Sequence, residues 1–170
     1  MTKAVRCHAG HRKKLCSSLV TQAEYCRFHL RKIFGLVIKR SGIRAAGLGL
    51  WTSPQKSLHK GALIGEYKGN ILTELQANTS NSLYLFELEP DYIIDAQSPR
   101  SCHARFINAS RAQNVRSGET CGNNSKFVWD KKKKKLLVYA TKPIQPNSEI
   151  LASYGCSYWN QVRKNAQSAS

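Results

Sequence analysis

Four side chains near the start of the chain have the types and spacing of a small metal site. Cys7, Cys16, Cys26 and His29 follow the pattern Cys-x8-Cys-x9-Cys-x2-His. Thiolates and imidazoles are preferred ligands of Zn²⁺, and a closed set of four is typical of a structural ion. Few large apolar residues accompany them, so a metal would be needed to hold the segment folded. The pattern predicts a structural zinc site, and the alternative is a metal-free basic tail.

Two histidines and the closing residues add to this pattern. His8 and His11 are further candidate ligands that could replace a cysteine or only flank the site. Residues 25–29 read Tyr-Cys-Arg-Phe-His, and with them the segment resembles small CCCH zinc knuckles. The other three cysteines are scattered without metal-ligand spacing, and we interpret them as buried or half-buried thiols.

Two segments in the second half of the chain carry a different chemistry. Residues 105–110 read Arg-Phe-Ile-Asn-Ala-Ser, with Asn114 following, and residues 149–155 read Glu-Ile-Leu-Ala-Ser-Tyr-Gly. Together they resemble the SET domain of protein-lysine methyltransferases. In that family the two segments form a pseudoknot beneath the S-adenosylmethionine site, which is a rare kind of connection. The resemblance implies a mainly β fold of short curved sheets with a C-terminal pseudoknot and few short helices, here with a small N-terminal zinc-binding module.

Three further motifs occur in the order that this family requires. Residues 46–51 resemble the opening Gly-x-Gly segment, residues 65–69 the Gly-Glu-Tyr-x-Gly turn, and residues 92–96 the Ile-Asp-Ala strand. A glycine pair alone would be weak support, because such pairs mark ordinary turns. Five motifs in order are strong support, and the resemblance covers about residues 38 to 159.

The resemblance implies methyl transfer from S-adenosylmethionine to a lysine amine. This displacement needs no metal, so positioning supplies most of the rate. The accepting amine must be neutral, and desolvation beside a cationic sulfonium lowers its pKa. Phenol oxygens and carbonyls then orient the amine. The family motifs place Tyr154 as the catalytic tyrosine and Tyr67 as a second tyrosine of the lysine channel.

The same resemblance assigns the cofactor site. The implied cofactor-binding residues are Leu48, Gly49, Leu50, Arg105, Asn108, Ala109, Tyr154 and Trp159. The backbone at 48–50 would meet the methionine end, and Asn108 with the Ala109 backbone would meet the amino acid and adenine. Arg105 would either anchor the pseudoknot or approach the cofactor carboxylate. Trp159 would cover the adenine face.

One departure from the family pattern leaves a second function open. Ala109 stands where the usual Asn-His-Ser-Cys-x-Pro-Asn motif has a histidine. This loss favours a catalytically inactive SET-fold module that binds chromatin or nucleic acid through basic patches. Retention of Tyr154 and Asn108 favours the enzyme.

Charge is distributed unevenly along this chain of net charge +17. Residues 1–65 hold 13 Lys or Arg against Glu24 alone, whereas residues 66–95 hold six acids against the single cation Lys68. In the SET resemblance the acidic stretch forms one wall of the substrate groove, where it would attract a basic protein segment such as a histone tail. The alternative is an ordinary solvated face.

A run of five lysines is the densest basic patch. Its members are Lys131, Lys132, Lys133, Lys134 and Lys135. The run lies between the strand-like segments 126–129 and 136–140, so we expect a hairpin tip with the cations in solvent. Such a tip could neutralise nucleic-acid phosphates or serve solubility alone.

Short apolar runs separated by Gly, Pro, Asn or Ser predict the remaining elements. We expect strands at 32–41, 48–53, 63–67, 71–73, 83–88 and 92–94, and helices at 73–78 and 158–166. The predicted domains are a zinc knuckle at 1–31, a SET domain at 32–164 and a flexible tail at 165–170. The sequence shows neither a membrane-length apolar run nor a signal peptide, which predicts an intracellular protein, nuclear or chromatin-associated if its substrate is a histone.

Overall fold

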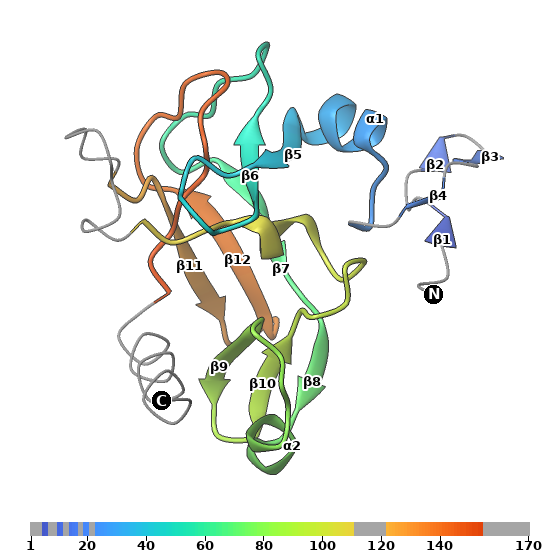
Figure 1. Cartoon of the computed structure of the whole chain (residues 1–170), viewed down its shortest axis with the longest axis vertical. Coiled ribbons are helices and arrows are strands. Elements are labelled where there is room, and N and C mark those ends of the chain that lie inside the picture. Colours follow the sequence, from blue (N-terminus) through green and yellow to red (C-terminus); the bar gives the residue numbers. More distant parts are fainter. Residues whose placement is uncertain are drawn as a thin grey trace.

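The computed structural model describes residues 5–6, 10–11, 14–16, 19–20, 23–110 and 122–154. Within them the fold consists of short strands and few helices, which confirms the predicted mainly β class. Figure 1 shows the strands grouped in several small sheets. No helix of the described part is long and apolar enough to cross a membrane.

A three-stranded antiparallel sheet in the order β11-β12-β7 supports the core. Strand β7 spans Leu63–Tyr67, β11 spans Ser125–Asp130 and β12 spans Lys135–Ala140. Alternate residues of β12, namely Leu136, Val138 and Ala140, are buried because successive side chains point to opposite faces of a strand. The three strands predicted in these segments are therefore confirmed, as is the lysine hairpin between β11 and β12.

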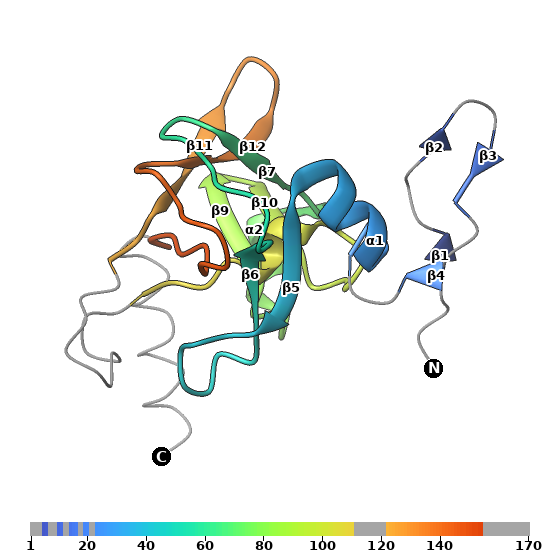
Figure 2. The ribbon, with the colours of Figure 1, turned by 90° about the horizontal axis from the view of Figure 1, so that it is seen from above.

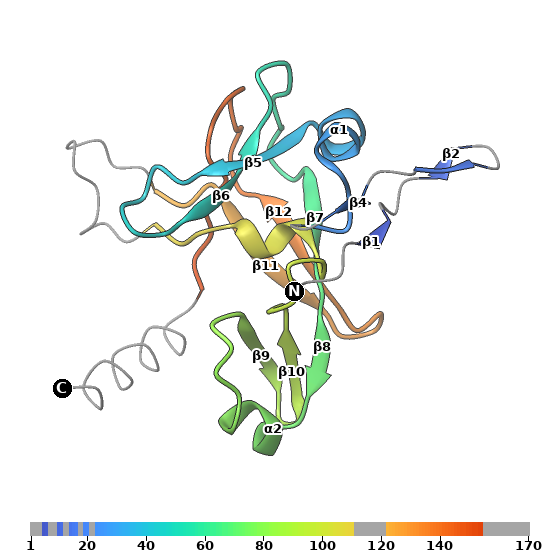
Figure 3. The same ribbon diagram turned by 45° about the vertical axis from the view of Figure 1, so that its right-hand side comes forward.

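A second antiparallel sheet has the order β8-β10-β9. Strand β8 spans Asn70–Leu72, β9 spans Leu85–Glu89 and β10 spans Tyr92–Asp95, with helix α2 at Glu74–Asn78. Thr73 and Gln76 close a reciprocal capping box at the start of α2, which fixes where the predicted helix begins. Figures 1 and 3 show this sheet and α2 as a lobe below β7, β11 and β12. We call residues 70–95 the acidic wall.

The chain enters the core through a helix rather than through the start of a strand. Helix α1 (Arg27–His29) continues into the π-helical segment η1 (Leu30–Phe34), which ends at Gly35 in the left-handed conformation, with φ 67°. The predicted strand at 32–41 is thus wrong for residues 32–34, where Leu30 and Phe34 form one apolar helix face against the core. It is confirmed for β5 (Leu36–Arg40), which pairs with β6 (Leu48–Thr52).

Four two-residue strands precede this helix. Strand β1 (Val5–Arg6) pairs with β4 (Leu19–Val20), and β2 (Gly10–His11) pairs with β3 (Lys14–Leu15). Figure 2 shows these strands to one side of the larger sheets, next to α1. The boundary predicted after residue 31 falls inside the helical run formed by α1 and η1. The helix expected at 158–166 and the tail at 165–170 lie outside the described residues.

The two motif segments of the sequence lie side by side in the structure. Leu151 pairs in parallel with Asn108, and Ala152 pairs in parallel with Ser125. The Ile150 N–H also donates to the Leu50 carbonyl at 2.8 Å. The segment 149–152 therefore runs between the end of the 3₁₀ turn η2 (His103–Phe106) and the start of β11, as the predicted pseudoknot requires.

Candidate active site and metal centre

A cavity of about 780 Å³ lies where the acidic wall meets the two motif segments. Its lining comes from the 43–48 loop, from the end of β7, from α2 and β9, from residues 105–109, and from single positions on β10, β11 and the C-terminal segment. Six of the predicted site residues line it: Leu48, Tyr67, Arg105, Asn108, Ala109 and Tyr154. The volume is in the range of small-molecule sites.

Four aromatic rings stand together on one side of this cavity. Phe127 packs edge-on against Tyr67, with ring centroids 5.7 Å apart, and lies 4.9 Å from Phe86. Tyr154 completes the group at 6.3 Å from Phe127. Such a lining excludes water and favours the neutral form of an amine that enters it.

Tyr67 is buried at the base of this aromatic group. Its hydroxyl donates to the Tyr84 carbonyl at 2.8 Å. Burial raises the pKa of Tyr67 far above its usual value, with smaller contributions from nearby Cys102 and Tyr154, so the phenol keeps its proton. A phenol whose proton is held by a carbonyl can still accept a hydrogen bond from an amine.

Tyr154 repeats this arrangement from the C-terminal segment. Its hydroxyl donates to the Ile107 carbonyl, which belongs to the other motif segment. Both tyrosines therefore have their proton held by a backbone carbonyl while lining the same cavity. Two fixed phenol oxygens could orient the lone pair of an amine placed between the four rings.

Glu149 joins the loop between β5 and β6 to Asn108. Its carboxylate accepts from the Ser41 hydroxyl at 2.6 Å and from the Gly42 N–H at 2.8 Å. The Asn108 side-chain amide donates to the same carboxylate at 3.3 Å and to the Leu48 carbonyl at 3.0 Å. These bonds fix the loop between β5 and β6 against Asn108.

Two of the predicted cofactor-binding residues lie outside the lining of the cavity. Leu50 is fully buried, and Gly49 packs against Glu149 so closely that an added Cβ would lie 2.2 Å from Oε1. Neither residue lines the cavity, although both belong to the strand that carries Leu48. Trp159 lies outside the described residues.

Arg105 is buried at the cavity edge and holds the chain that follows β10. Its guanidinium donates to the carbonyls of Ala96 and Gln97 at 2.7 and 3.1 Å. It also stacks over the Tyr84 ring at 3.8 Å. These contacts anchor Arg105 to residues 96–97, and its role toward the pseudoknot or the cofactor carboxylate stays a prediction.

The acidic wall divides into paired carboxylates and carboxylates that face the cavity. Glu89 pairs with Lys131 at 3.0 Å, and Asp95 accepts from the Ser82 hydroxyl at 2.6 Å. Glu74 and Glu87 instead line the cavity, and neither makes an ion pair with a described residue. These two carboxylates are the ones placed to meet a cationic substrate.

The lysine hairpin is exposed, but several of its lysines are paired with carboxylates. All five lysines are solvent-exposed. Three of them nevertheless pair with carboxylates, Lys131 with Glu89, Lys133 with Asp130 and Lys135 with Glu66. Surface ion pairs of this kind are weak, so the hairpin remains basic while it is tethered to the acidic wall.

Sequence reasoning missed Phe127 and the 43–47 loop as parts of the cavity. The available signal for Phe127 was the hairpin register, in which it pairs with Val138 on the strand next to Tyr67. Of the loop, only Ala46 and Gly47 belonged to a motif, the Gly-x-Gly segment. Its position follows from the Glu149 contacts, which join residues more than 100 positions apart.

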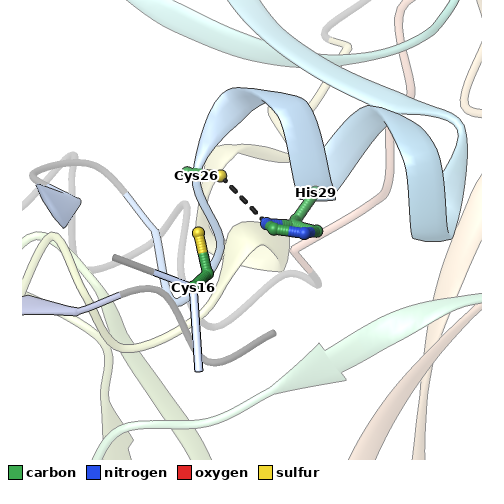
Figure 4. A group of neighbouring side chains, drawn as sticks. All are labelled: Cys16, Cys26 and His29. Atoms are coloured by element: carbon green, nitrogen blue, oxygen red, sulfur yellow. Dashed lines mark hydrogen bonds between the residues drawn. The ribbon is translucent and has the colours of Figure 1, made fainter. Parts of the chain in front are cut away.

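Three of the four predicted metal ligands come together, as Figure 4 shows. The ligand atoms of Cys16, Cys26 and His29 lie within 4.8 Å of one another, and Cys26 Sγ is 3.2 Å from His29 Nδ1. Cys7 and His8 lie outside the described residues, as does the side chain of His11. Two thiols and an imidazole fit zinc, and a fourth ligand would close the site.

The remaining cysteines were expected to be buried or half-buried thiols. Cys102 is fully buried, which confirms this interpretation for that residue. Burial raises the pKa of Cys102, so it stays a neutral thiol. Cys121 and Cys156 lie outside the described residues.

Residues 47–155 match the family model of the SET domain, which is more than half of the chain. The protein therefore belongs to the SET-domain family, within the methyltransferase superfamily. SET domains are usually S-adenosylmethionine-dependent lysine methyltransferases. No curated protein sequence matches the chain.

Proposed function

We propose that this protein is a protein-lysine N-methyltransferase that uses S-adenosylmethionine and acts on a lysine in a basic protein segment, such as a histone tail. The observation that carries the proposal is the pair of buried or half-buried tyrosines, Tyr67 and Tyr154, whose hydroxyls donate to carbonyls inside one aromatic cavity. Membership of the SET family supports it independently. A nuclear, chromatin-associated location would follow from a histone substrate.

The lysine would enter between the four aromatic rings. Phe86 and Phe127 would exclude water from it, and loss of water lowers the pKa of an amine. Tyr154 and Tyr67 would accept hydrogen bonds from the neutral amine and aim its lone pair. Fixing the reacting groups in this way can supply several orders of magnitude in rate without a metal.

The cofactor would occupy the part of the cavity between the 43–48 loop and residues 105–109. The backbone at Leu48 would hold its methionine end, with Asn108 and Ala109 on the other side. Trp159 would cover the adenine. When bound, S-adenosylmethionine supplies the electrophilic methyl group. The loop that would hold it is already fixed by Glu149 and Asn108.

We further propose that Cys7, Cys16, Cys26 and His29 hold a structural zinc ion. The proximity of the three described ligands supports this site. A closed set of four protein ligands leaves no open position for substrate, so the ion would stabilise the fold rather than take part in methyl transfer.

A second candidate function is a catalytically inactive module that binds nucleic acid or chromatin through Lys131–Lys135. The alanine at position 109 and the exposure of the hairpin favour it. The ion pairs to Glu66 and Glu89 weaken it, because they compete with phosphate for two of the five lysines.

Calorimetric titration of the zinc-loaded protein with S-adenosylmethionine, followed by radiolabelled methyl transfer to histones and nucleosomes, separates the two functions. The enzyme hypothesis predicts saturable binding and label in a lysine. Absence of binding at about millimolar cofactor, together with salt-dependent affinity for duplex DNA, would support the inactive module instead.

A further inference from the structure

A buried pair of polar side chains joins the metal-ligating segment to the SET core. Glu24 and His103 are 3% and 2% exposed, and Oε1 of Glu24 is 3.1 Å from Nδ1 of His103. The other ring nitrogen of His103 is 3.1 Å from the Ile64 carbonyl oxygen. Buried polar groups are costly unless satisfied, so this pair holds its two segments in one arrangement. The mechanism proposed above does not use either residue.

On one side the pair is continuous with the metal ligands. Glu24 stands two residues before Cys26 in the sequence, and the helical run that begins at Arg27 carries His29. Tyr25 packs edge-on against Phe34, and Phe34 lies 4.9 Å from the His103 ring. A shift of the helix start would therefore move the groups packed around His103.

On the other side the pair touches two elements of the cavity. His103 is the first residue of η2, whose later residues Arg105 and Phe106 line the cavity. Its Nε2 also lies 2.4 Å from where a Cβ on Gly65 would be, so β7 is packed directly against the ring. Strand β7 ends at Tyr67. His103 thus stands between the segment that carries the metal ligands and two elements that line the cavity, η2 and β7.

We propose that the Glu24–His103 pair couples metal binding at the cysteine-histidine cluster to the geometry of the cavity, with His103 as a positioning residue. A metal ion would fix Cys26 and His29, and through them the position of Glu24. Glu24 would then hold His103, η2 and β7 in register. Because coupling between two sites is reciprocal, cofactor binding would raise zinc affinity by the same factor as zinc raises cofactor affinity. The cofactor part of this inference rests on the function proposed above.

Hydrogen exchange on the unmodified protein tests the coupling without relying on cofactor. We expect zinc removal by a chelator to speed amide exchange at 103–107 and 63–67, while β9 and β10, which belong to a different sheet from β7, keep their rates. A change confined to residues 1–34 would overturn the proposal. So would a uniform increase over all strands, because that pattern reports global destabilisation.

Substitutions at Glu24 provide the second test. Glu24→Leu removes the bond to His103, Glu24→Gln keeps an acceptor of the same size, and His59→Gln changes an exposed histidine away from the cavity. In the unmodified protein we expect zinc to raise cofactor affinity about tenfold. Glu24→Leu should retain zinc affinity but lose most of that increase, whereas Glu24→Gln and His59→Gln should keep it.

The outcomes separate this inference from the proposed function. Full zinc coupling in Glu24→Leu would overturn the role of the pair. If no form of the protein binds cofactor but exchange at 103–107 still depends on zinc, the proposed function fails and the coupling stands. If Glu24→Leu does not fold, the exchange pattern of the unmodified protein decides.

Discussion

The floor of the cavity and its acidic wall are built in different ways. The floor consists of residues 105–108 and 149–154, where Ile107, Ile150 and Ala152 are buried and neighbouring backbone groups are paired. The acidic wall leaves Leu75 and Leu83 at 77% and 76% exposed. The floor has a single arrangement imposed by long-range pairing, while the wall presents side chains to solvent.

This difference suggests a division of work between the two regions. Tyr154, Asn108 and Glu149 belong to the floor, where hydrogen bonds fix their positions relative to one another. Glu74 and Glu87 belong to the wall, where neither makes an ion pair with a described residue. We therefore expect substitutions in the floor to change turnover and those in the wall to change substrate affinity.

The largest expected effect is that of Tyr154→Phe in the floor. This change removes the hydroxyl that would orient the amine and leaves the ring in place. We expect kcat to fall about 10²-fold or more, by analogy with the loss of one preorganised hydrogen-bonding group. Single-turnover methyl transfer would measure the loss of rate. Cofactor titration would measure the cofactor affinity, which should change little.

Tyr139→Phe is the matched control, because Tyr139 lies on β12 and does not line the cavity. Equal activity of Tyr154→Phe and the unmodified protein would contradict the role of the Tyr154 hydroxyl in orienting the amine.

Gly69→Ala tests the connection between β7 and the wall. Gly69 follows β7, and an added Cβ would lie 1.9 Å from the backbone oxygen of Asp95. Because backbone must move to accept it, we expect a loss of about 1–3 kcal/mol in the free energy of unfolding. Urea titration would measure it, with Gly122→Ala as control, since Gly122 has only a lysine tip 4.0 Å away. Unchanged stability would show that β8 is not held against β10 as described.

Tyr67→Phe should alter how stability depends on pH. Burial raises the pKa of Tyr67 in the folded protein above the value of about 10 in the unfolded chain. The contribution of Tyr67 to the free energy of unfolding is therefore fully present below about pH 10, and it is lost as the pH rises toward the pKa of the folded protein. Tyr67→Phe should lower the free energy of unfolding by about 1 kcal/mol at neutral pH, because the bond to the Tyr84 carbonyl is lost. The free energy of unfolding of this variant should then decrease less steeply with rising alkaline pH than that of the unmodified protein.

Urea unfolding of Tyr67→Phe and of Tyr139→Phe at about pH 8 and about pH 10.5 would measure this difference, since the two pH values lie on either side of the phenol pKa. If the free energy of unfolding changes equally between the two pH values in Tyr67→Phe and in the unmodified protein, Tyr67 is solvated.

The smallest effects are expected from single charges of the wall. Glu74→Gln or Glu87→Gln should raise KM for a basic peptide about two- to fivefold with kcat unchanged, because exposed charges contribute up to about 1 kcal/mol. Salt should diminish the effect. Steady-state kinetics at two ionic strengths would show it, with Glu89→Gln as control, because Glu89 pairs with Lys131 and does not line the cavity. A drop in kcat with constant KM would remove the proposed division between wall and floor.

The sequence predicted most strands well, because their signal is local. The predicted strand at 63–67 coincides with β7, and the helix at 73–78 begins at the Thr73 cap. The helical run at 27–34 was missed because alternating apolar and basic residues after Lys32 fit a strand. Its signals were present in the Leu30 and Phe34 spacing and in Gly35, which ends the helix.

The site was only partly predictable from sequence. Family motifs pointed to Tyr67 and Asn108, both of which line the cavity. Motifs could not indicate that Glu24 meets His103, because that contact joins residues 79 positions apart and depends on the whole core. The same limit applies to the exposed Glu74 and Glu87, because the sequence alone does not distinguish these cavity-lining carboxylates from the paired carboxylates nearby.

The parallel pairing of Leu151 with Asn108 and of Ala152 with Ser125 also affects the order of synthesis and folding. On the ribosome, strands β5 to β10 leave the exit tunnel before residues 149–154 exist. The cavity floor can form only after those last residues emerge and pair with chain made much earlier. Such non-local contacts form slowly, so the nascent chain would pass through an interval with an assembled acidic wall and no complete cavity.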